Sequence, residues 1–376
     1  MRKIGIIAEY NPFHNGHIYH IQKIKELYPD SLLILVLNGY FLERGEISVL
    51  SKENKTKLAL KNDIDIVLEL PVIYGTQSSD TFAEASINIL QNFQIEEIIF
   101  GSESTNIEEI QEIAKEQIEK KFTFKIKDKT QNYPTLLAKN LNIPNIIPPN
   151  DLLAISYCKA IFKNHYSIKT TPILRTSSYH NITSSEPIIS ASNIRYKRKN
   201  QENIHKYLPA EALNSWQEVD MQKLFEFLKY RILTDNHLDS YIDVTEGLDF
   251  KMKKEIKNAK NYEEFIKNLK SKRYTYNRIN RMLIHVLLGH QKKIAKEPLS
   301  YIKILGFSKK GQEYLNSIRK NIQIPLTPIK DSIQYQEEIK ASLLYDMLTH
   351  SQNSLFDIQN KPIIYTKETS KESNQK

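Results

Sequence analysis

The sequence predicts an α/β protein, in which a doubly wound parallel sheet is followed by a mostly helical domain. Apolar runs alternate with helical patterns through the N-terminal part of the chain, which is typical of βα units. Six of the ten glycines lie at positions 5, 16, 39, 45, 75 and 101, so we expect the tight, ligand-facing turns in the same region. From about Pro209 onward the pattern becomes helical.

The individual strands and helices follow from hydrophobic periodicity. The run Leu32–Asn38 is apolar almost throughout, as expected of a parallel strand that helices cover on both faces. Alternation of such runs with helices is most simply satisfied by a parallel, doubly wound sheet. The expected elements are, in order, strand Lys3–Ala8, helix Gly16–Leu27, strand Leu32–Asn38, helix Ser51–Asn62, strand Ile64–Leu70, helix Thr81–Phe93, strand Glu97–Phe100, helix Ile107–Lys121, helix Asp151–Asn164 and strand Pro172–Arg175.

A second domain is expected after residue 200. The serine-rich segment Ile182–Asn193, which precedes it, is predicted to be a mobile loop. Residues 1–200 would form the sheet domain, residues 201–365 a helical domain, and residues 366–376 a polar, disordered tail. The expected helices of the second domain are Met221–Leu233, Gly247–Ala259, Tyr262–Lys270 and Tyr276–Leu288.

Composition excludes several classes of protein. The 376 residues are 40% hydrophobic and 26% charged, as in an ordinary globular protein. No apolar run approaches the roughly 18 residues that a membrane span needs, and no secretory signal is expected at the N-terminus. The single cysteine, Cys158, is expected to pack in a helix; it cannot form an internal disulfide or a cysteine metal cluster. A cytoplasmic location without a membrane partner fits these features, and no oligomeric state is predicted.

The net charge of +9 is concentrated in one block of the sequence. Between Lys251 and Ile294 there are 13 Lys or Arg residues against 3 Glu, so this block alone carries about +10. A localised basic block indicates a polyanionic partner such as RNA. A solvated helix face rich in lysine is the alternative interpretation.

The strongest chemical signal is a pair of histidines, His14 and His17, where the first strand turns into the first helix. In an open α/β sheet this junction holds nucleotide phosphates, because the helix N-terminus offers backbone N–H groups. Two imidazoles can donate hydrogen bonds to phosphate oxygens and to the charge that develops when pyrophosphate leaves. The alternative is a helix start with two surface histidines. A metal site is less well supported, because Glu9 is the only nearby carboxylate.

The segment His14-Asn15-Gly16-His17 resembles the HxGH motif of the nucleotidyltransferase superfamily, whose domains have a Rossmann-like fold. The chain as a whole resembles the bacterial tRNA(Met) cytidine acetate ligase family. The segments that carry this resemblance are Ala8–His17, Arg44-Gly45-Glu46, Phe100–Glu103, Pro149–Leu153, Tyr241–Leu248 and Lys272–Thr275.

The resemblance implies a two-step reaction. Acetate would be activated with ATP to acetyl-adenylate and pyrophosphate. Mg²⁺ is the expected cofactor and would be bound with the nucleotide. The acetyl group would then pass to the N4 amine of the wobble cytidine in the anticodon loop of elongator tRNA(Met). Catalysis would rest on His14, His17 and Arg195. The expected ATP contacts are Ile7, Ala8, Glu9, Tyr10, Asn11, Pro12, Phe13, His14, Asn15, Gly16, His17, His20, Gly101, Asn150, Arg175, Ser190 and Ser192.

Some of these expected ATP contacts also have an ordinary structural interpretation from the sequence alone. Asn150 could be a helix cap, and Gly101 an ordinary turn glycine at the end of a strand. The segment Ile189–Arg195 resembles the second signature of these enzymes, a serine-rich turn that would hold the β- and γ-phosphates with Arg195. Its alternative interpretation is a capped helix with a basic first turn.

Contacts with tRNA are expected where cations are grouped with aromatic side chains. Cations neutralise phosphates, and aromatic rings can stack on bases. A basic helix packed on a core is the alternative. The expected tRNA-binding residues are Lys197, Arg198, Lys199, Lys272, Arg273, Tyr274, Arg278 and Arg281.

Two other functions fit the same fold. A small-molecule adenylyltransferase would use the histidine pair but would not need a helical domain with a basic block. A non-catalytic RNA-binding protein would keep the basic block, but it would have no need of the intact His14-Asn15-Gly16-His17 segment.

Overall fold

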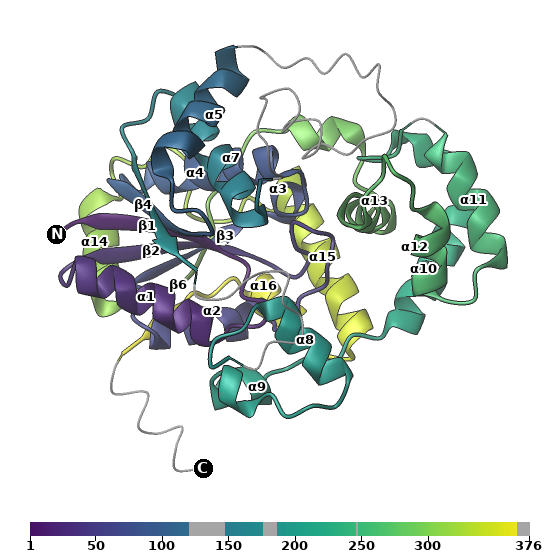
Figure 1. Cartoon of the computed structure of the whole chain (residues 1–376), viewed down its shortest axis with the longest axis horizontal. Helices are drawn as coiled ribbons and strands as arrows, with labels where there is room; N and C mark the ends of the chain where they lie inside the picture. The colour runs from purple at the N-terminus through teal and green to yellow at the C-terminus, as the bar shows by residue number, and fades with distance from the viewer. Residues whose placement is uncertain (120–146, 176–185, 246, 367–376) are drawn as a thin grey trace.

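Figure 1 shows the computed structural model of the chain, which describes residues 1–119, 147–175, 186–245 and 247–366. A seven-stranded sheet runs through the larger part of the molecule, in the order β5-β4-β1-β2-β3-β6-β7. Strands β1 to β5 are mutually parallel, which confirms the α/β fold predicted from the sequence. The strands are β1 (Lys3–Ala8), β2 (Leu32–Asn38), β3 (Ile66–Leu70), β4 (Glu97–Ser102), β5 (Lys169–Leu174), β6 (Ile304–Ser308) and β7 (Ile363–Tyr365).

Helices cover both faces of the sheet because the side chains of each strand alternate between the two faces. On β2, Leu33 and Leu35 pack with one core cluster, which includes Ile21 and Ile24 of α1, whereas Ile34 packs with the other, which includes α4, α5 and α7. These helices and their neighbours are α1 (Asn15–Leu27), α2 (Lys52–Lys61), α3 (Val72–Gly75), α4 (Ser79–Asn92), α5 (Ile107–Glu119), α7 (Pro149–Lys163), α8 (Ala191–Lys199) and α9 (Ala210–Asn214).

The strand order reverses at β1, which lies between β4 and β2. The chain runs from β1 through β2 to β3 on one side, and returns to place β4 and β5 on the other. The loops after β1 and β4 therefore diverge at the carboxyl edge of the sheet. A crevice at such a reversal is where ligands bind in open α/β folds.

A group of helices lies beside the sheet, on the right of Figure 1. Helix α13 has His285, Val286 and Leu288 buried. The group consists of α10 (Met221–Thr234), α11 (Leu248–Asn258), α12 (Tyr262–Leu269) and α13 (Tyr276–Leu288), with the 3-10 turns His205–Tyr207, Leu238–Ser240 and Lys292–Lys296 along the chain around them.

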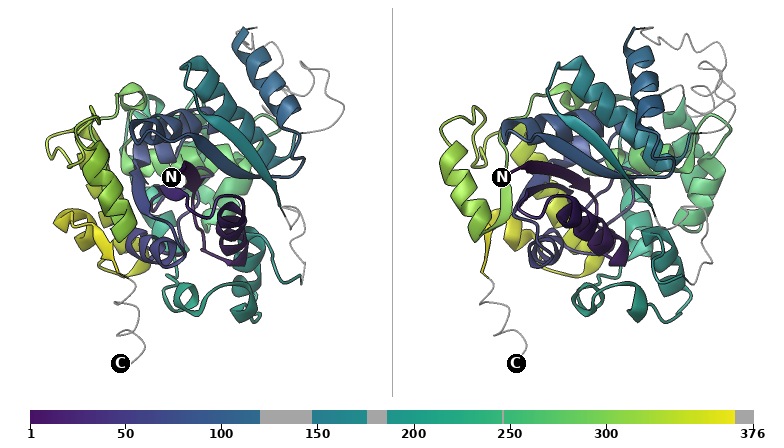
Figure 2. Two further views of the ribbon diagram at one scale, coloured as in Figure 1. Left: turned by 90° about the vertical axis from the view of Figure 1, so that its left-hand side faces the viewer. Right: turned by 60° about the vertical axis from the view of Figure 1, so that its left-hand side comes forward.

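The C-terminal part of the chain returns to the sheet, and this corrects the expected division at residue 200. Strand β6 pairs antiparallel with β3, and β7 pairs with β6, so residues 201–365 are not one helical domain. Both views of Figure 2 show these C-terminal elements along one edge of the sheet. The physical reason is that β3 would otherwise present an unpaired edge. Between the two strands lie α14 (Lys309–Ile318), α15 (Ile333–Thr349) and α16 (Ser354–Gln359).

Buried ion pairs attach this returning segment to the sheet. The ammonium of Lys52, which is fully buried, lies 2.5 Å from Glu69 of β3, 2.8 Å from Asp357 of α16 and 3.0 Å from Glu338 of α15. Lys303 adds a second cation, 2.7 Å from Asp357. Burial and the neighbouring carboxylates raise the pKa of Glu338 to about 7. Glu69 thus belongs to a structural ion network.

Other expectations differ only at element ends. The predicted strand Pro172–Arg175 is observed as Lys169–Leu174, and the predicted loop Ile182–Asn193 gives way to α8 at Ala191. Residues 182–185 of that loop and 367–376 of the expected tail lie outside the described residues. Within the described residues, every helix is too short or too polar to cross a membrane.

Candidate active site

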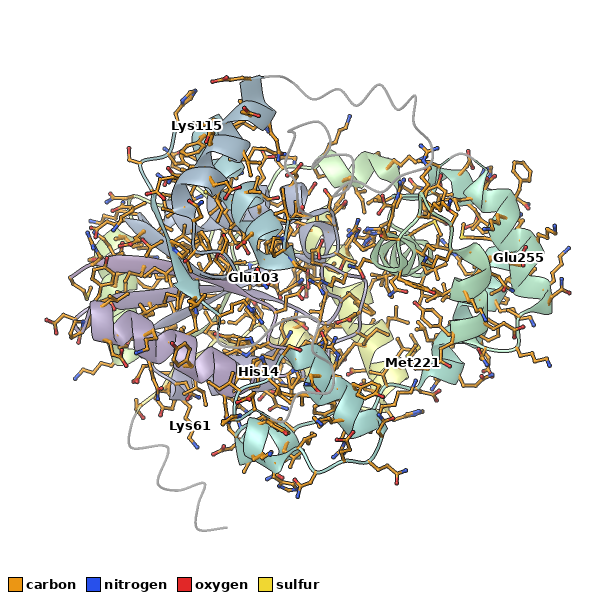
Figure 3. The ribbon with its side chains drawn as sticks, viewed as in Figure 1. His14, Lys61, Glu103, Lys115, Met221 and Glu255 are labelled. Atoms are coloured by element: carbon orange, nitrogen blue, oxygen red, sulfur yellow. The ribbon has the colours of Figure 1, made fainter. Side chains whose placement is uncertain are left out.

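The loop after β1 brings the histidine pair to the carboxyl edge of the sheet. His14 is the N-cap of α1, and the rings of His14 and His17 lie 4.0 Å apart between centroids. Phe13 stacks on His17 at 5.6 Å, and Tyr10 packs edge-on against Phe13 at 4.8 Å. Figure 3 labels His14 in this position, and Glu103 just after β4. The apolar rings of the loop thus hold the imidazoles in place.

Backbone hydrogen bonds determine the tautomers of both imidazoles. Nδ1 of His14 accepts from the N–H of Gly16 at 2.9 Å, and Nδ1 of His17 accepts from the N–H of His14 at 3.2 Å. In a neutral imidazole the other nitrogen then carries the proton. Both histidines therefore present Nε2–H donors, as a phosphate site requires.

Electrostatics keep these imidazoles neutral. Burial, with the positive charges of Arg175 and Arg195, lowers the pKa of His14 to about 3. Burial, the adjacent ring of His14 and the charge of Arg175 also hold the pKa of His17 well below its ordinary value. His20, one turn further along α1, has its pKa lowered by burial to about 4. The site is thus positive through its two arginines, and the histidines contribute hydrogen bonds.

Arg175 approaches the histidines from the β4 side of the crevice. Its Nη1 donates to Oδ1 of Asn150 at 3.3 Å, and Nδ2 of Asn150 donates to Glu103 at 2.5 Å. A Cβ on Gly101 would lie 3.2 Å from Cγ of Arg175, so glycine permits the close approach of the guanidinium. Nε of Arg175 is buried and has no hydrogen-bond partner among the described residues. That orphaned donor is suited to an anionic ligand.

Arg195 approaches from the opposite side, on α8. Ser190 caps this helix by accepting from the N–H of Asn193 at 3.2 Å. Nη1 of Arg195 donates to the carbonyl of Asn11 at 2.5 Å, and Nη2 donates to Glu46 at 2.6 Å. The structure therefore brings the HxGH segment and the serine-rich segment Ile189–Arg195 together, although they are far apart in sequence. Ser192 lies half-buried in the first turn of α8.

Gly16 is required by close packing between these two segments. A Cβ at Gly16 would lie 2.6 Å from Cε1 of His14 and 3.3 Å from Cγ2 of Ile188, in the segment before α8. Nδ2 of Asn15 donates to the carbonyl of Lys206 at 2.8 Å. The HxGH turn is thus enclosed by the chain that leads into and out of α8.

A short hairpin over residues 40–48, which we call the acidic hairpin, lies next to the histidine loop. Its strands are joined by the N–H of Ser48 to the carbonyl of Tyr40 at 2.8 Å, and by that of Leu42 to Glu46 at 3.0 Å. Glu43 and Glu46 flank its tip, where Gly45 has a left-handed backbone with φ of +71°. The hairpin forms one wall beside Arg195.

Glu9 connects this hairpin to β1 and β2. Its Oε1 accepts from the N–H of Glu43 at 2.7 Å and from Nδ2 of Asn38 at 3.0 Å. Burial raises the pKa of Glu9. Below it, Nζ of Lys55 donates to the carbonyls of Glu9, Asn38 and Gly39 at 3.0, 2.7 and 2.6 Å. The ends of the first two strands are therefore held together beneath the site.

The acidic hairpin also contacts the helical group. The carboxylate of Glu43 pairs with Arg281 of α13 at 3.3 Å, and burial raises the pKa of Glu43. Arg281 and Arg278 both lie near Asp243, at 3.6 and 3.8 Å. Arg281, predicted as a tRNA contact, thus joins the helical group to the hairpin, whereas Arg278 pairs with Asp243 inside the helical group.

The other predicted tRNA contacts differ in their exposure and in their ion pairs. Lys197 is 8% exposed and pairs with Glu202 at 2.8 Å, Arg198 pairs with Glu218 at 3.0 Å, and Lys199 pairs with Glu263 at 2.8 Å. Tyr274 is buried beneath Arg278 and Arg273, whereas Lys272 is exposed.

Helix α11 presents a further basic face. Leu248, Met252 and Ile256 are buried, so the opposite side of the helix faces outward. On that side Phe250 is 77% exposed and is followed by Lys253, Lys254 and Lys257. No ion pair joins these three lysines to the described residues. The sequence placed them in the basic block but did not select them individually.

Sequence reasoning also missed Glu9 as a structural carboxylate, and missed Glu43, Glu46 and Glu103 entirely as site residues. The signal for Glu46 was its place in the Arg44-Gly45-Glu46 segment.

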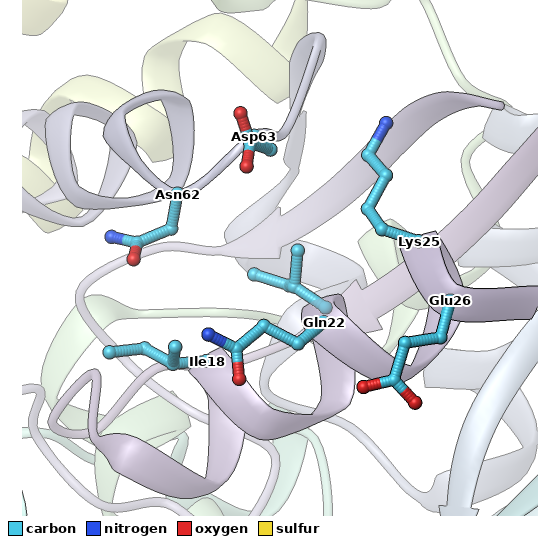
Figure 4. A pocket seen from close by; sticks show the side chains of 7 residues that line it. Ile18, Gln22, Lys25, Glu26, Asn62 and Asp63 are labelled. Carbon is cyan, nitrogen blue, oxygen red and sulfur yellow. The ribbon is translucent and has the colours of Figure 1, made fainter. Parts of the chain in front are cut away.

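The prediction that Cys158 packs in a helix is confirmed. Cys158 is buried in α7, and burial raises the pKa of its thiol to about 12. A surface pocket shown in Figure 4 lies along α1 and the end of α2; its lining residues include Gln22, Lys25 and Asp63 and none of the predicted ATP contacts.

Comparison with known proteins agrees with this geometry. Residues 1–360 match the family described as HIGH Nucleotidyl Transferase, so the chain is a nucleotidyl transferase of that class. The tRNA(Met) cytidine acetate ligase of Geobacillus sp. (strain WCH70) is 36% identical over 377 residues, covering 92% of this chain and 94% of that protein. The ligase of Leuconostoc mesenteroides is 35% identical, covering 98% and 100%. The chain belongs to the tRNA(Met) cytidine acetate ligase family.

Solved structures give the same result. The crystal structure of Thermotoga maritima TmcAL bound with alpha-thio ATP is 25% identical to this chain, with a TM-score of 0.81 and coverage of 97% of this chain and 99% of that one. The apo form of the same protein gives a TM-score of 0.83. The Rossmann-like nucleotidyltransferase fold expected from the motif is confirmed.

Proposed function

We propose that this protein activates acetate with ATP and transfers the acetyl group to N4 of the wobble cytidine of elongator tRNA(Met). The observation that carries the proposal is the convergence at one sheet edge of two Nε2–H donors, on His14 and His17, with Arg175 and Arg195 on either side. The names of relatives that match this chain over nearly its whole length support the choice of substrates.

The first step requires positioning and charge stabilisation and no protein nucleophile. An acetate oxygen attacks the α-phosphorus of ATP, a bond to that phosphorus forms, and the bond to the pyrophosphate oxygen breaks. The donors of His14, His17 and Arg195 would stabilise the charge on the departing pyrophosphate. Arg175, held by Asn150, would bind phosphate from the other side.

Mg²⁺ would enter with the nucleotide. Mg²⁺ in nucleotide sites is bound largely by phosphate oxygens and water, with one or two carboxylates at most. The part of the chain that the structure describes contains no group of three His, Cys, Asp or Glu side chains arranged for a metal ion. Mg²⁺, if bound with ATP, would add positive charge beside the phosphates that His14, His17 and Arg195 contact.

The anticodon loop would enter between the histidine loop and the helical group. Single-stranded loops can turn a base out of the stack into a pocket. The basic face of α11 would bind the phosphates of the tRNA body, together with the exposed predicted contacts Arg198, Lys199 and Lys272. A cytoplasmic location follows from these substrates.

The test is incubation of the purified protein with ATP, Mg²⁺ and radiolabelled acetate, with and without total bacterial tRNA. We expect N4-acetylcytidine in the tRNA, lost in His14→Ala and in His17→Ala. Acetate-dependent release of pyrophosphate without labelled tRNA would leave adenylation but refute the acceptor. Transfer of AMP to a small phosphate ester in place of acetate would favour the small-molecule adenylyltransferase. Tight tRNA binding with neither reaction would favour a binding protein.

A further inference from the structure

The second step of the proposed reaction needs a proton acceptor, and this inference rests on that proposed function. The N4 lone pair of cytidine attacks the acetyl carbonyl carbon, and a nitrogen–carbon bond forms. The bond from that carbon to the phosphate oxygen breaks, and AMP leaves with the electron pair. The amine nitrogen must also lose one proton. An exocyclic amine conjugated with the base is a poor nucleophile, so a positioned acceptor raises the rate.

The imidazoles of the site cannot serve as that acceptor. Nδ1 of His14 and Nδ1 of His17 already accept hydrogen bonds from backbone N–H groups, so both Nε2 atoms carry protons. Burial and Arg175 make it unfavourable for either ring to take a second proton. Both histidines are therefore donors, and the acceptor must be another group.

The carboxylates around the histidine loop differ in the hydrogen bonds and ion pairs that they already make. Glu103 uses Oε1 and Oε2 to accept from the side chain and the backbone of Asn150. Glu43 pairs with Arg281 and lies against α13. Glu9 accepts two hydrogen bonds that join β1, β2 and the acidic hairpin. These three carboxylates have structural contacts that a proton transfer would weaken.

Glu46 has a different arrangement. Its side chain is 36% exposed, and its Oε2 accepts from Nη2 of Arg195 at 2.6 Å and from Nδ2 of Asn11 at 3.4 Å. Its Oε1 accepts no hydrogen bond from the residues that the structure describes. Because Arg195 and Asn11 hold one oxygen, the carboxylate is oriented, and the second oxygen is available.

The position of Glu46 fits an acceptor base. It stands at the tip of the acidic hairpin, which touches the histidine loop through Glu9 and helix α13 through Gly45 and Glu43. A base that enters between the two parts of the molecule would meet this tip. Carboxylates are also the side chains that accept hydrogen bonds from the N4 amine of cytosine.

We propose that Oε1 of Glu46 accepts a hydrogen bond from the N4 amine of the target cytidine and takes its proton as the acetyl group is transferred. Oε2 stays with Arg195, so the carboxylate keeps its orientation during the reaction. Glu46 would then be a catalytic residue of the second step. In the first step it would only hold Arg195, and the amide oxygen of a glutamine can accept that hydrogen bond as well.

The experiment separates the two half-reactions in Glu46→Gln. Acetate-dependent exchange of pyrophosphate into ATP measures the first, and single-turnover acetyl transfer from preformed acetyl-adenylate to tRNA measures the second. We expect exchange to stay within about threefold of the wild type and transfer to fall by ~10²-fold or more. Glu46→Asp should recover part of the transfer rate. Filter binding should give an unchanged affinity for tRNA.

Glu9→Gln is the matched comparison, because it removes a neighbouring carboxylate charge from the same loop. We expect it to slow both half-reactions together, since Glu9 holds the loop. Equal loss of both steps in Glu46→Gln would overturn the proposal, since Glu46 would then only position Arg195. Unchanged transfer, or selective loss of transfer in Glu9→Gln instead, would also overturn it. If the wild type transfers no acetyl group to tRNA, the proposed function itself is refuted. That result is distinguishable from a failure of the Glu46 assignment, in which the wild type does transfer acetyl.

Discussion

Gly45 at the tip of the acidic hairpin lies directly against the backbone of Arg281 in α13. A Cβ at Gly45 would lie 2.3 Å from the amide nitrogen of Arg281 and 2.4 Å from the carbonyl carbon of Asn280. The acidic hairpin is therefore joined to the helical group by a backbone-to-backbone contact. It is reinforced by the ion pair of Glu43 with Arg281.

Gly45→Ala should separate the hairpin from α13. We expect a loss in the free energy of unfolding of about 2–4 kcal/mol, combining left-handed backbone strain with overpacking. The matched control is Gly247→Ala, because Gly247 has φ of +76° but no atom within 4 Å of a Cβ. Its expected cost is only the backbone strain, about 1 kcal/mol. Urea unfolding of both variants measures the difference, and equal losses would contradict the packing argument.

His14→Asn should separate the structural and chemical roles of this residue. Asparagine is a good N-cap, so the free energy of unfolding should change by less than about 0.5 kcal/mol. Acetate-dependent pyrophosphate exchange should nevertheless fall by ~10²-fold or more, because the Nε2–H donor is lost. His14→Ala should lose the same activity and, in addition, about 1 kcal/mol of stability. Retained exchange in His14→Asn would show that the residue acts only as a cap.

Acid should destabilise the protein through the buried histidines. The folded-state pKa values of His14 and His20 are lowered to about 3 and about 4, so below their ordinary value of 6.5 the unfolded state binds more protons. The free energy of unfolding should therefore fall as the pH drops from 6.5 toward 4. His14→Asn should reduce the fall between pH 6.5 and pH 5 by about 1–2 kcal/mol.

Urea unfolding at several pH values between 7 and 5 measures this effect. His205→Asn, at an exposed position, is the control that leaves the buried histidines intact. An identical pH dependence in the wild type and in His14→Asn would show that His14 does not titrate in this window.

Arg175→Lys should weaken ATP binding. A lysine has one ammonium in place of a planar fork, so it cannot both hold Asn150 and bind phosphate. We expect the Kd for a non-hydrolysable ATP analogue to rise about tenfold, equivalent to about 1.4 kcal/mol. Calorimetric titration measures it. An unchanged Kd would show that Arg175 serves only to hold Asn150.

The basic face of α11 should contribute to tRNA binding by charge. Replacement of Lys253, Lys254 and Lys257 by Ala should lower the affinity for tRNA and make its dependence on salt less steep, with a slope smaller by about 2–3. Lys163→Ala is the control, since Lys163 pairs with Glu84 and is not among the predicted tRNA contacts. Filter binding over a range of salt concentrations measures both quantities. A slope that does not change would place the tRNA elsewhere.

The sequence predicted most of the sheet domain because its signals are local. The first strand, the histidine turn and the first helix follow one another within 27 residues, and each has its own periodicity or cap. The same holds for β2 and β4 and for helices α10 to α13. The ATP contacts of the histidine loop, Gly101, Asn150 and Arg175 depended on the family resemblance, and their roles stay predictions.

Pairing between distant segments could not be predicted in this way. The five residues of β6 contain a glycine and no distinctive pattern, and their place beside β3 depends on the unpaired edge of that strand. Ion pairs of the predicted tRNA contacts could not be predicted either: Arg281 reaches Glu43, 238 positions earlier in the chain. A charge in a sequence does not indicate which opposite charge the fold will place next to it.

The sequence by itself therefore determined the α/β class, the strand–turn–helix that carries His14 and His17, and the family. Only the tertiary structure decided that the C-terminal segment completes the sheet and that Glu46 holds Arg195 across 149 positions of sequence. It also decided that the histidines are neutral donors. The physical reason is that propensity and periodicity act between near neighbours, whereas burial, ion pairing and desolvation depend on which distant segments meet in the folded chain.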